Sequence, residues 1–187
     1  QRAATVIAVA VGLTVLTLPG SLLASYATGE ALLWRRPERA LTVEVTGRQW
    51  WWEVRYPNPV AALTVVAANE VHVPIGTPVL IRLRSADVIH SFWVPSLAGK
   101  RDLVPGYRSA LWFVADSAGT YSGRCAEFCG HQHAGMALVV VAESQERFDA
   151  WLTRQREPAR PAAADRGHAA FMAASWPMCH AIRGNGA

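Results

Sequence analysis

Two cysteines, two histidines and a methionine lie close together between Cys125 and Met136, and these residue types are suited to binding a metal ion. The segment reads Cys-Ala-Glu-Phe-Cys-Gly-His-Gln-His-Ala-Gly-Met, and another histidine, His90, precedes it by 35 positions. Thiolates, imidazoles and a thioether form a soft ligand set that favours copper, whereas the methionine argues against zinc. The segment therefore predicts a copper site rather than a site for a hard cation.

The second cysteine indicates more than one copper ion. A mononuclear blue-copper site uses one cysteine, two histidines and a weak axial methionine, so Cys125 and Cys129 together exceed its needs. Both sulfurs can instead bridge a pair of copper ions, with one histidine for each ion. The methionine and a backbone carbonyl can fill the weaker positions. Because one electron shared by two bridged metals changes their geometry little, such a site suits electron transfer.

Two other interpretations of the cysteines remain open from spacing alone. Cys125 and Cys129 could form a disulfide, or they could bind a structural zinc ion together with His131 and His133. The full spacing through Met136 weighs against both interpretations, because neither needs a thioether.

The central part of the sequence, which has to position these ligands, predicts a β-sheet fold. Apolar and polar residues alternate over 41–45 and again over 79–83, as in half-buried strands. The runs 109–114 and 136–141 are rich in β-branched and aromatic residues, with Pro and Gly between them. Several short strands over about 100 residues indicate an antiparallel sandwich or barrel.

The N-terminal part of the sequence predicts a transmembrane helix. From Ala3 to Gly29 there are 27 residues without a charge, which exceeds the roughly 20 that cross the hydrocarbon core of a bilayer. A signal peptide is the alternative, but its apolar region is shorter. Pro19 and Gly20 within the run are tolerated in membrane helices.

These segments predict three parts of the chain. Residues 1–39 form the transmembrane helix and a connector, 40–155 an all-β domain with a closing helix, and 156–187 a linker and a short tail. Ser144 is placed to cap the closing helix, whose apolar face carries Phe148, Trp151 and Leu152.

Composition agrees with a membrane-anchored protein that does not bind nucleic acid. The chain is 51% hydrophobic and only 17% charged, less charged than a typical soluble domain at about 25%. Between Leu41 and Arg147 nine acidic and nine basic residues balance, so the net charge of +4 arises at the ends of the chain. Nothing in this pattern predicts a basic, aromatic-lined surface.

Four separated motifs together resemble the subunit II family of haem-copper cytochrome c oxidases. The first is the Cys-x-Glu-x-Cys-Gly-x-x-His-x-x-Met segment itself. The other three, in the order that the family has them, are Gly47-Arg-Gln-Trp-Trp-Trp52, Asp87-Val-Ile-His-Ser-Phe-Trp-Val-Pro95 and Lys100-Arg-Asp-Leu-Val-Pro-Gly106. The resemblance implies a cupredoxin-like Greek-key β-sandwich on a helical anchor.

The resemblance also implies the roles of individual residues. It assigns copper ligation to His90, Cys125, Cys129, His133 and Met136, with the backbone carbonyl of Glu127 as a further ligand. The carboxylate of Glu127 is expected to reach a magnesium ion at the border with the catalytic subunit. His131 falls at a variable position of the family motif and is expected to face solvent, while His72 is expected to be an ordinary surface or core histidine.

The three consecutive tryptophans match the segment where electrons enter from cytochrome c in this family. Strand alternation predicts Trp50 and Trp52 on one face and Trp51 on the other, whereas the family's point of electron uptake matches Trp50. A bulge or loop at the start of the strand could expose Trp50. Trp50 and Trp51 are our candidates for electron uptake. The alternative is that all three rings simply pack in the core.

The implied function is one-electron relay from cytochrome c to a dinuclear copper centre and on to haem in subunit I, which reduces oxygen and pumps protons. The implied partners are subunits I and III of the oxidase, cytochrome c and the lipid bilayer. The chain would then lie in the inner cell membrane with its copper domain on the periplasmic side. Only one of the family's usual two spans is present, and we interpret the first span as missing from this sequence.

Three other functions compete with this interpretation. A quinol oxidase subunit II lacks the copper ligands, all six of which are present here. The copper domain of nitrous oxide reductase has a similar loop, but the Glu-x-Cys-Gly pattern and the anchor do not suit it. A copper chaperone would not need the tryptophan segment.

The C-terminal tail resembles the start of a cytochrome c domain that some subunit II chains carry. The covalent haem motif is Cys-x-x-Cys-His, and here Trp176 stands where the first cysteine belongs, ahead of Cys179 and His180. We therefore expect a truncated or degenerate segment that binds no covalent haem c.

Overall fold

The computed structural model describes residues 1–34, 40–157 and 166–174. The chain divides into two compact units, Gln1–Arg39 and Ala40–Ala187. In the first, helix α1 (Arg2–Trp34) is continuous through Pro19, and its segment Arg2–Glu30 has a mean hydropathy of 2.2. By length and composition this segment is a candidate membrane span, as the uncharged run predicted.

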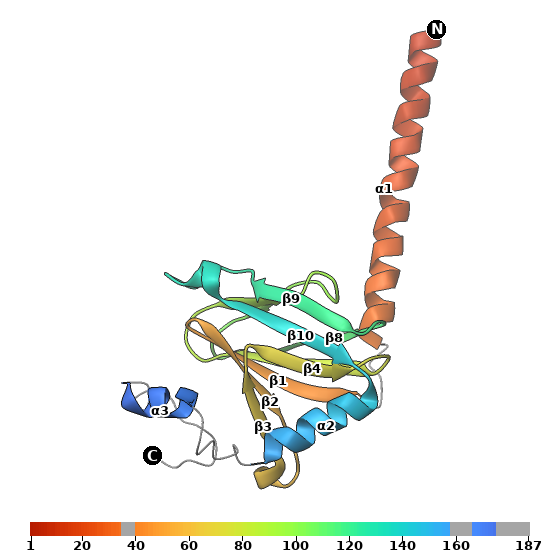
Figure 1. Cartoon of the computed structure of the whole chain (residues 1–187). Coiled ribbons are helices and arrows are strands. Elements are labelled where there is room, and N and C mark those ends of the chain that lie inside the picture. The colour runs from red at the N-terminus through yellow and green to blue at the C-terminus, as the bar shows by residue number, and fades with distance from the viewer. Residues whose placement is uncertain (35–39, 158–165, 175–187) are drawn as a thin grey trace. The chain divides into compact units, whose positions relative to one another are not determined.

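The second unit contains two sheets, which pack face to face as a sandwich (Figure 1). The first sheet has the strand order β3-β2-β1-β5-β8. Its strands are β1 (Leu41–Arg48), β2 (Trp51–Tyr56), β3 (Val65–Ala68), β5 (Pro78–Ser85) and β8 (Ser109–Val114).

The second sheet contains the strands that present the predicted metal ligands. Its order is β4-β10-β9-β6-β7. The strands are β4 (Glu70–Pro74), β6 (His90–Trp93), β7 (Arg101–Leu103), β9 (Gly119–Cys125) and β10 (Ala137–Glu143). Short 3₁₀ helices, η1 (Ala61–Leu63) and η2 (His133–Gly135), lie in two of the connections.

The core forms between the two sheets because apolar residues alternate along the strands. In β1 Val43 and Val45 are fully buried, and in β5 the same holds for Val79 and Ile81. Trp52 of β2 meets Phe92 of β6 edge to face at 5.7 Å, a contact that links one sheet to the other. The predicted all-β sandwich is thereby confirmed.

The sequence indicated an antiparallel sandwich or barrel, but the sandwich also contains parallel strand pairs. Strand β1 pairs in parallel with β5, and β10 pairs in parallel with β4, while the other pairs are antiparallel. Parallel neighbours need a connection that crosses over, and β2 to β4 supply it between β1 and β5. Alternation reports which face of a strand is buried and carries no information on the direction of its neighbour.

Helix α2 (Gln145–Arg156) closes one end of the sandwich, as the sequence predicted. The Ser144 hydroxyl accepts a bond from the Arg147 N–H and caps the helix. Phe148 and Trp151 are buried, and the Trp151 ring stacks on His72 at 4.1 Å. A further short helix, α3 (Arg166–Ala173), follows. The predicted haem-motif remnant with Cys179 and His180 lies outside the described residues.

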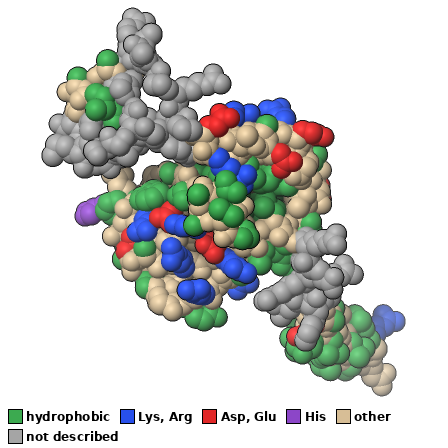
Figure 2. Space-filling view, turned by 90° about the horizontal axis from the view of Figure 1, so that it is seen from below, with side chains coloured by type: hydrophobic (Ala, Val, Ile, Leu, Met, Phe, Trp, Pro, Cys, Tyr) green, Lys and Arg blue, Asp and Glu red, His purple; other side chains and the backbone are tan. Residues whose placement is uncertain are grey.

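The face of the molecule shown in Figure 2 carries basic and acidic side chains interspersed with hydrophobic ones. This mixture agrees with the balance of charge in the central part of the sequence.

Candidate metal centre

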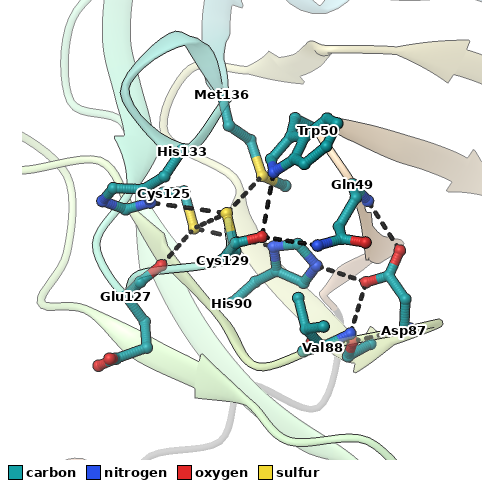
Figure 3. A network of polar contacts seen from close by, with 11 residues as sticks. Gln49, Trp50, Asp87, Val88, His90, Cys125, Glu127, Cys129, His133 and Met136 are labelled. Carbon is teal, nitrogen blue, oxygen red and sulfur yellow. Dashed lines mark hydrogen bonds and ion pairs between the residues drawn. The ribbon is translucent and has the colours of Figure 1, made fainter. Parts of the chain in front are cut away.

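The predicted ligands meet at one end of the second sheet because three chain segments end there. His90 is the first residue of β6, and Cys125 is the last residue of β9. These strands are antiparallel, with Phe92 opposite Cys125, so the start of one lies beside the end of the other. The connection from β9 to β10 then folds back over His90 and brings the remaining ligands with it (Figure 3).

Six donor groups converge in this end of the sheet. The Cys125 and Cys129 sulfurs lie 3.8 Å apart. Around them are the Glu127 carbonyl oxygen at 3.2 Å from the Cys125 sulfur, His90 Nδ1 at 3.8 Å from the same sulfur, His133 Nδ1 at 3.5 Å from the Cys129 sulfur, and Met136 Sδ at 3.7 Å from the Cys129 sulfur.

The separation of the sulfurs decides between the interpretations of the cysteine pair. Both thiols are free and buried, and 3.8 Å is far longer than a disulfide bond of about 2.05 Å. The structural zinc interpretation needs His131, but this residue is exposed, and His90 completes the group with the two cysteines instead. Soft donors on opposite sides of two close sulfurs fit a thiolate-bridged pair of copper ions.

Burial controls the protonation of Cys129. Burial, followed by the neighbouring thiol of Cys125, raises the pKa of Cys129 to about 12. Without a metal ion this thiol therefore stays protonated at neutral pH. A metal ion binds the thiolate, so binding has to release the proton.

Asp87 holds the other side of the centre by orienting His90. Its Oδ1 lies 2.7 Å from His90 Nε2 and also accepts the Val88 N–H. Burial raises the pKa of Asp87, but the bonds from His90, from the Gln49 N–H and from the Val88 N–H outweigh it and leave the pKa below its ordinary value. An ionised carboxylate only accepts hydrogen bonds, so Nε2 carries the proton and the Nδ1 lone pair points toward Cys125.

The strand behind His90 is shaped to admit its ring. A Cβ atom at Gly47 would lie 2.8 Å from His90 Cδ2 and 2.9 Å from Cγ. Strand β1 therefore needs glycine at this position. Sequence reasoning assigned no role to Gly47 or Asp87, although both belong to motifs that carried the family resemblance, and that membership was the available signal.

Comparison with known proteins places this site in a family. Residues 60–143 match the family model described as cytochrome C oxidase subunit II, periplasmic domain. Cytochrome c oxidase subunit 2 of Alkalihalophilus pseudofirmus is 37% identical over 152 residues, which cover 80% of this chain and 43% of that protein. The corresponding protein of Synechocystis is 41% identical over 112 residues, which cover 60% and 32%.

The domain belongs to the cytochrome c oxidase subunit II family.

A solved structure of a subunit II domain supports the same assignment. The crystal structure of the periplasmic domain of subunit II of cytochrome oxidase from Bradyrhizobium japonicum superposes with a TM-score of 0.60 at 29% identity. The match covers 64% of this chain and 96% of that one, and it confirms the cupredoxin-like fold. The chain spans less than half the length of the two subunit 2 proteins named above.

In this subunit II domain Trp50 does not lie on the strand that alternation assigned to it. Strand β2 begins at Trp51, and Trp50 stands in the turn before it. Because Trp50 lies outside the strand, alternation does not determine which way its half-buried ring faces. Its Nε1–H donates to the Cys129 carbonyl at 3.0 Å. Trp52 is fully buried, so the prediction that Trp50 and Trp52 share a strand face was wrong.

Trp51 lies on the opposite side of β2 from Trp52, as alternation predicted. It is half-buried, and the Arg48 guanidinium lies over its ring, 5.8 Å from the centroid. The three tryptophans thus occupy three different environments, and Trp50 is the one bonded to a ligand residue.

The remaining candidate residues point away from the sulfurs. Figure 3 shows the Glu127 carboxylate directed outward while its backbone carbonyl faces Cys125. His131 is exposed, as expected. His72 is buried between two carboxylates, with Nδ1 2.7 Å from Glu143 Oε1 and Nε2 against Glu70, and it takes no part in the metal centre.

Proposed function

We propose that this chain is the electron-accepting subunit of a haem-copper terminal oxidase. It receives electrons from cytochrome c at a dinuclear copper centre and passes them to haem in subunit I, where oxygen is reduced and protons are pumped. The observation that supports this most directly is the convergence of four soft or neutral donor groups on two free, buried sulfurs. The relatives that share the domain carry the name of a subunit of this oxidoreductase.

Each ligand has a distinct task in this proposal. Cys125 and Cys129 would hold the two copper ions through their thiolates, and His90 and His133 would each supply an imidazole. Met136 and the Glu127 carbonyl would be the weaker ligands. The copper pair would supply one-electron transfer. His90 and Met136 are almost completely buried, which keeps water away from the centre.

Electrons enter at Trp50 in this proposal. Its indole N–H donates to the Cys129 carbonyl oxygen, and that oxygen is joined through four covalent bonds of the same residue to the Cys129 sulfur. Trp51 lies beside it in the chain and offers its partly exposed ring to a docked donor. Sequence alone had left simple packing of all three rings open, and the indole bond favours Trp50 as the route.

The surroundings of the domain complete the proposal. The Glu127 carboxylate contributes to a magnesium site shared with subunit I. Subunits I and III are the membrane partners, and α1 anchors the chain in the inner cell membrane. The copper domain lies on the periplasmic side, which the relatives' periplasmic domains support.

Electron paramagnetic resonance of the copper-loaded chain in detergent tests the proposal. We expect two copper ions per chain and a hyperfine pattern in which one unpaired electron couples equally to both nuclei. A single copper ion per chain, with coupling to one nucleus, would contradict the dinuclear centre.

A further inference from the structure

Gln49 connects the turn before β2 with both sides of the metal centre. Its side-chain Nε2 donates to the Cys129 carbonyl at 2.8 Å. Its backbone N–H donates to Asp87 Oδ2 at 2.7 Å. Figure 3 shows Gln49 between the Cys129 carbonyl and the Asp87 carboxylate. Gln49, in the turn between β1 and β2, therefore contacts the main chain of the ligand Cys129 and the carboxylate that orients the ligand His90.

The Cys129 carbonyl accepts two bonds from adjacent residues. Besides the Gln49 amide, the Trp50 indole N–H donates to it at 3.0 Å. A carbonyl oxygen has two lone pairs, so these bonds fill its acceptor capacity and fix its direction from two sides. The Gln49 bond therefore helps to set the position of the carbonyl oxygen to which the Trp50 indole N–H donates.

Gly130 makes room for this pair of donors. A Cβ atom there would lie 3.0 Å from Gln49 Nε2 and 3.3 Å from Trp50 Nε1, and the backbone has a φ of +112°. Both the space and the backbone conformation favour glycine. The amide and the indole therefore reach the carbonyl through a gap that the residue after Cys129 leaves open.

We propose that Gln49 is a positioning residue for electron uptake. Its amide holds the Cys129 carbonyl where the Trp50 indole can bond to it, and its backbone N–H anchors the turn to Asp87. The inference rests on the proposed function, in which electrons enter at Trp50 through its bond to the Cys129 carbonyl. Without the Gln49 amide, the turn keeps its backbone bond to Asp87, but the Cys129 carbonyl loses one of its two donors. The hydrogen bond from the Trp50 indole to this carbonyl then breaks more often.

The first test measures the indole bond itself and needs no metal. In the metal-free full chain in detergent, labelled with ¹⁵N-tryptophan, each indole N–H gives one signal, and Trp50→Phe identifies that of Trp50. Gln49→Met keeps the length of the side chain and removes the donor. We expect the Trp50 indole proton to exchange with solvent about five- to tenfold faster, the weight of one neutral hydrogen bond.

A matched control and a second variant keep this test decisive. Gln145→Met makes the same substitution in α2, where the amide bonds only Asp149 within the part of the chain described here, and it should leave the Trp50 signal unchanged. Should Gln49→Met fail to fold, Gln49→Glu replaces the amide donor by an acceptor of the same length and should accelerate exchange as well. Unchanged exchange in the folded variants overturns the inference.

The second test separates the inference from the function on which it rests. In copper-loaded Gln49→Met we expect unchanged copper content, an unchanged paramagnetic spectrum and electron uptake from reduced cytochrome c that is about five- to tenfold slower. Faster indole exchange with unaltered uptake would overturn the role in uptake. A wild-type spectrum without the shared-electron pattern would instead reject the proposed function and leave the exchange result standing.

Discussion

At the scale of single residues, the geometry of the centre depends on the residues that orient the metal ligands as well as on the ligands themselves. His90 is fixed by the Asp87 carboxylate at one ring nitrogen and packs against Gly47. The ligands themselves were predictable because their residue types declare soft-metal chemistry. The roles of Asp87 and Gly47 could not be predicted, because carboxylates and glycines are common in any sequence. These roles arise only when β1 and β6 are brought together in the fold.

Gly47→Ala should weaken copper binding by displacing His90. The added Cβ would approach the ring within 2.8 Å, and the ring is fully buried, so it has little room to move. Such overpacking costs about 1–3 kcal/mol in folding free energy. Thermal unfolding and copper titration of the detergent-solubilised chain measure both effects. Gly99→Ala is the matched control, because a Cβ there meets nothing within 4 Å. Equal behaviour of the two variants would contradict the role of Gly47.

Copper affinity should rise with pH through the neutral range. The pKa of Cys129 lies at about 12 because of burial and the neighbouring Cys125 thiol, so protons compete with copper for this sulfur throughout that range. Raising the pH lowers the proton concentration and favours the metal, by about tenfold per pH unit for each proton released. Competition with a chelator of known pH dependence, between about pH 6 and pH 8, measures the slope. A flat profile would show that the Cys129 thiol is already ionised.

Trp50→Phe should slow electron uptake while copper content stays the same. Phenylalanine keeps an aromatic ring but lacks the indole N–H that bonds the Cys129 carbonyl. Stopped-flow reduction of the copper-loaded chain by cytochrome c measures the rate, and we expect a loss of about tenfold or more, the effect of a misplaced group on a transfer step. Trp112→Phe in β8 is the control. Normal uptake in Trp50→Phe would make packing the better account of this ring.

At the scale of elements, alternation located strands but could not fix where they end or how they pair. It placed β1 and β5 correctly, while β8 was located by its β-branched and aromatic residues. It failed at Trp50 because β2 begins one residue later, and a turn is not bound by the period of a strand. It also gave no sign of the parallel pairs, which depend on the order of strands in space. The closing helix was predictable, since its cap and its apolar face are both local signals.

Trp151→Leu should destabilise the domain without removing the metal centre. The Trp151 ring stacks on His72 and meets Tyr56 edge to face at 5.1 Å, so this side chain helps, together with buried Phe148, to hold α2 to the sandwich. We expect a loss of about 2–3 kcal/mol in the free energy of unfolding, since leucine fills only part of the space. Denaturant unfolding of the metal-free chain measures it. Leu152→Ala, on the half-buried flank of the same helix, should cost less. A larger effect in Leu152→Ala would place the main contact elsewhere on α2.

At the scale of the whole molecule, two sides of the centre are contacted by different residues. Trp50 and Gln49 contact it through the Cys129 carbonyl, whereas Glu127 contacts it through its own carbonyl and sends its carboxylate outward. In the proposed oxidase the first side receives electrons and the second faces subunit I. In the same proposal the main chain of Glu127 serves the copper centre and its side chain serves the magnesium site.

Glu127→Gln should therefore leave copper in place and weaken the neighbouring magnesium site. The backbone carbonyl that faces Cys125 survives the substitution, so copper content and the paramagnetic spectrum should not change. The neutral amide is a poorer ligand for Mg²⁺ than a carboxylate, and we expect the affinity for Mg²⁺, or for Mn²⁺ as its spectroscopic substitute, to fall about tenfold or more in the assembled oxidase. Glu146→Gln, an exposed acid at the start of α2, controls for the loss of one negative charge. Loss of copper would mean that the side chain supports the centre, and unaltered Mn²⁺ binding would remove the carboxylate from the second site.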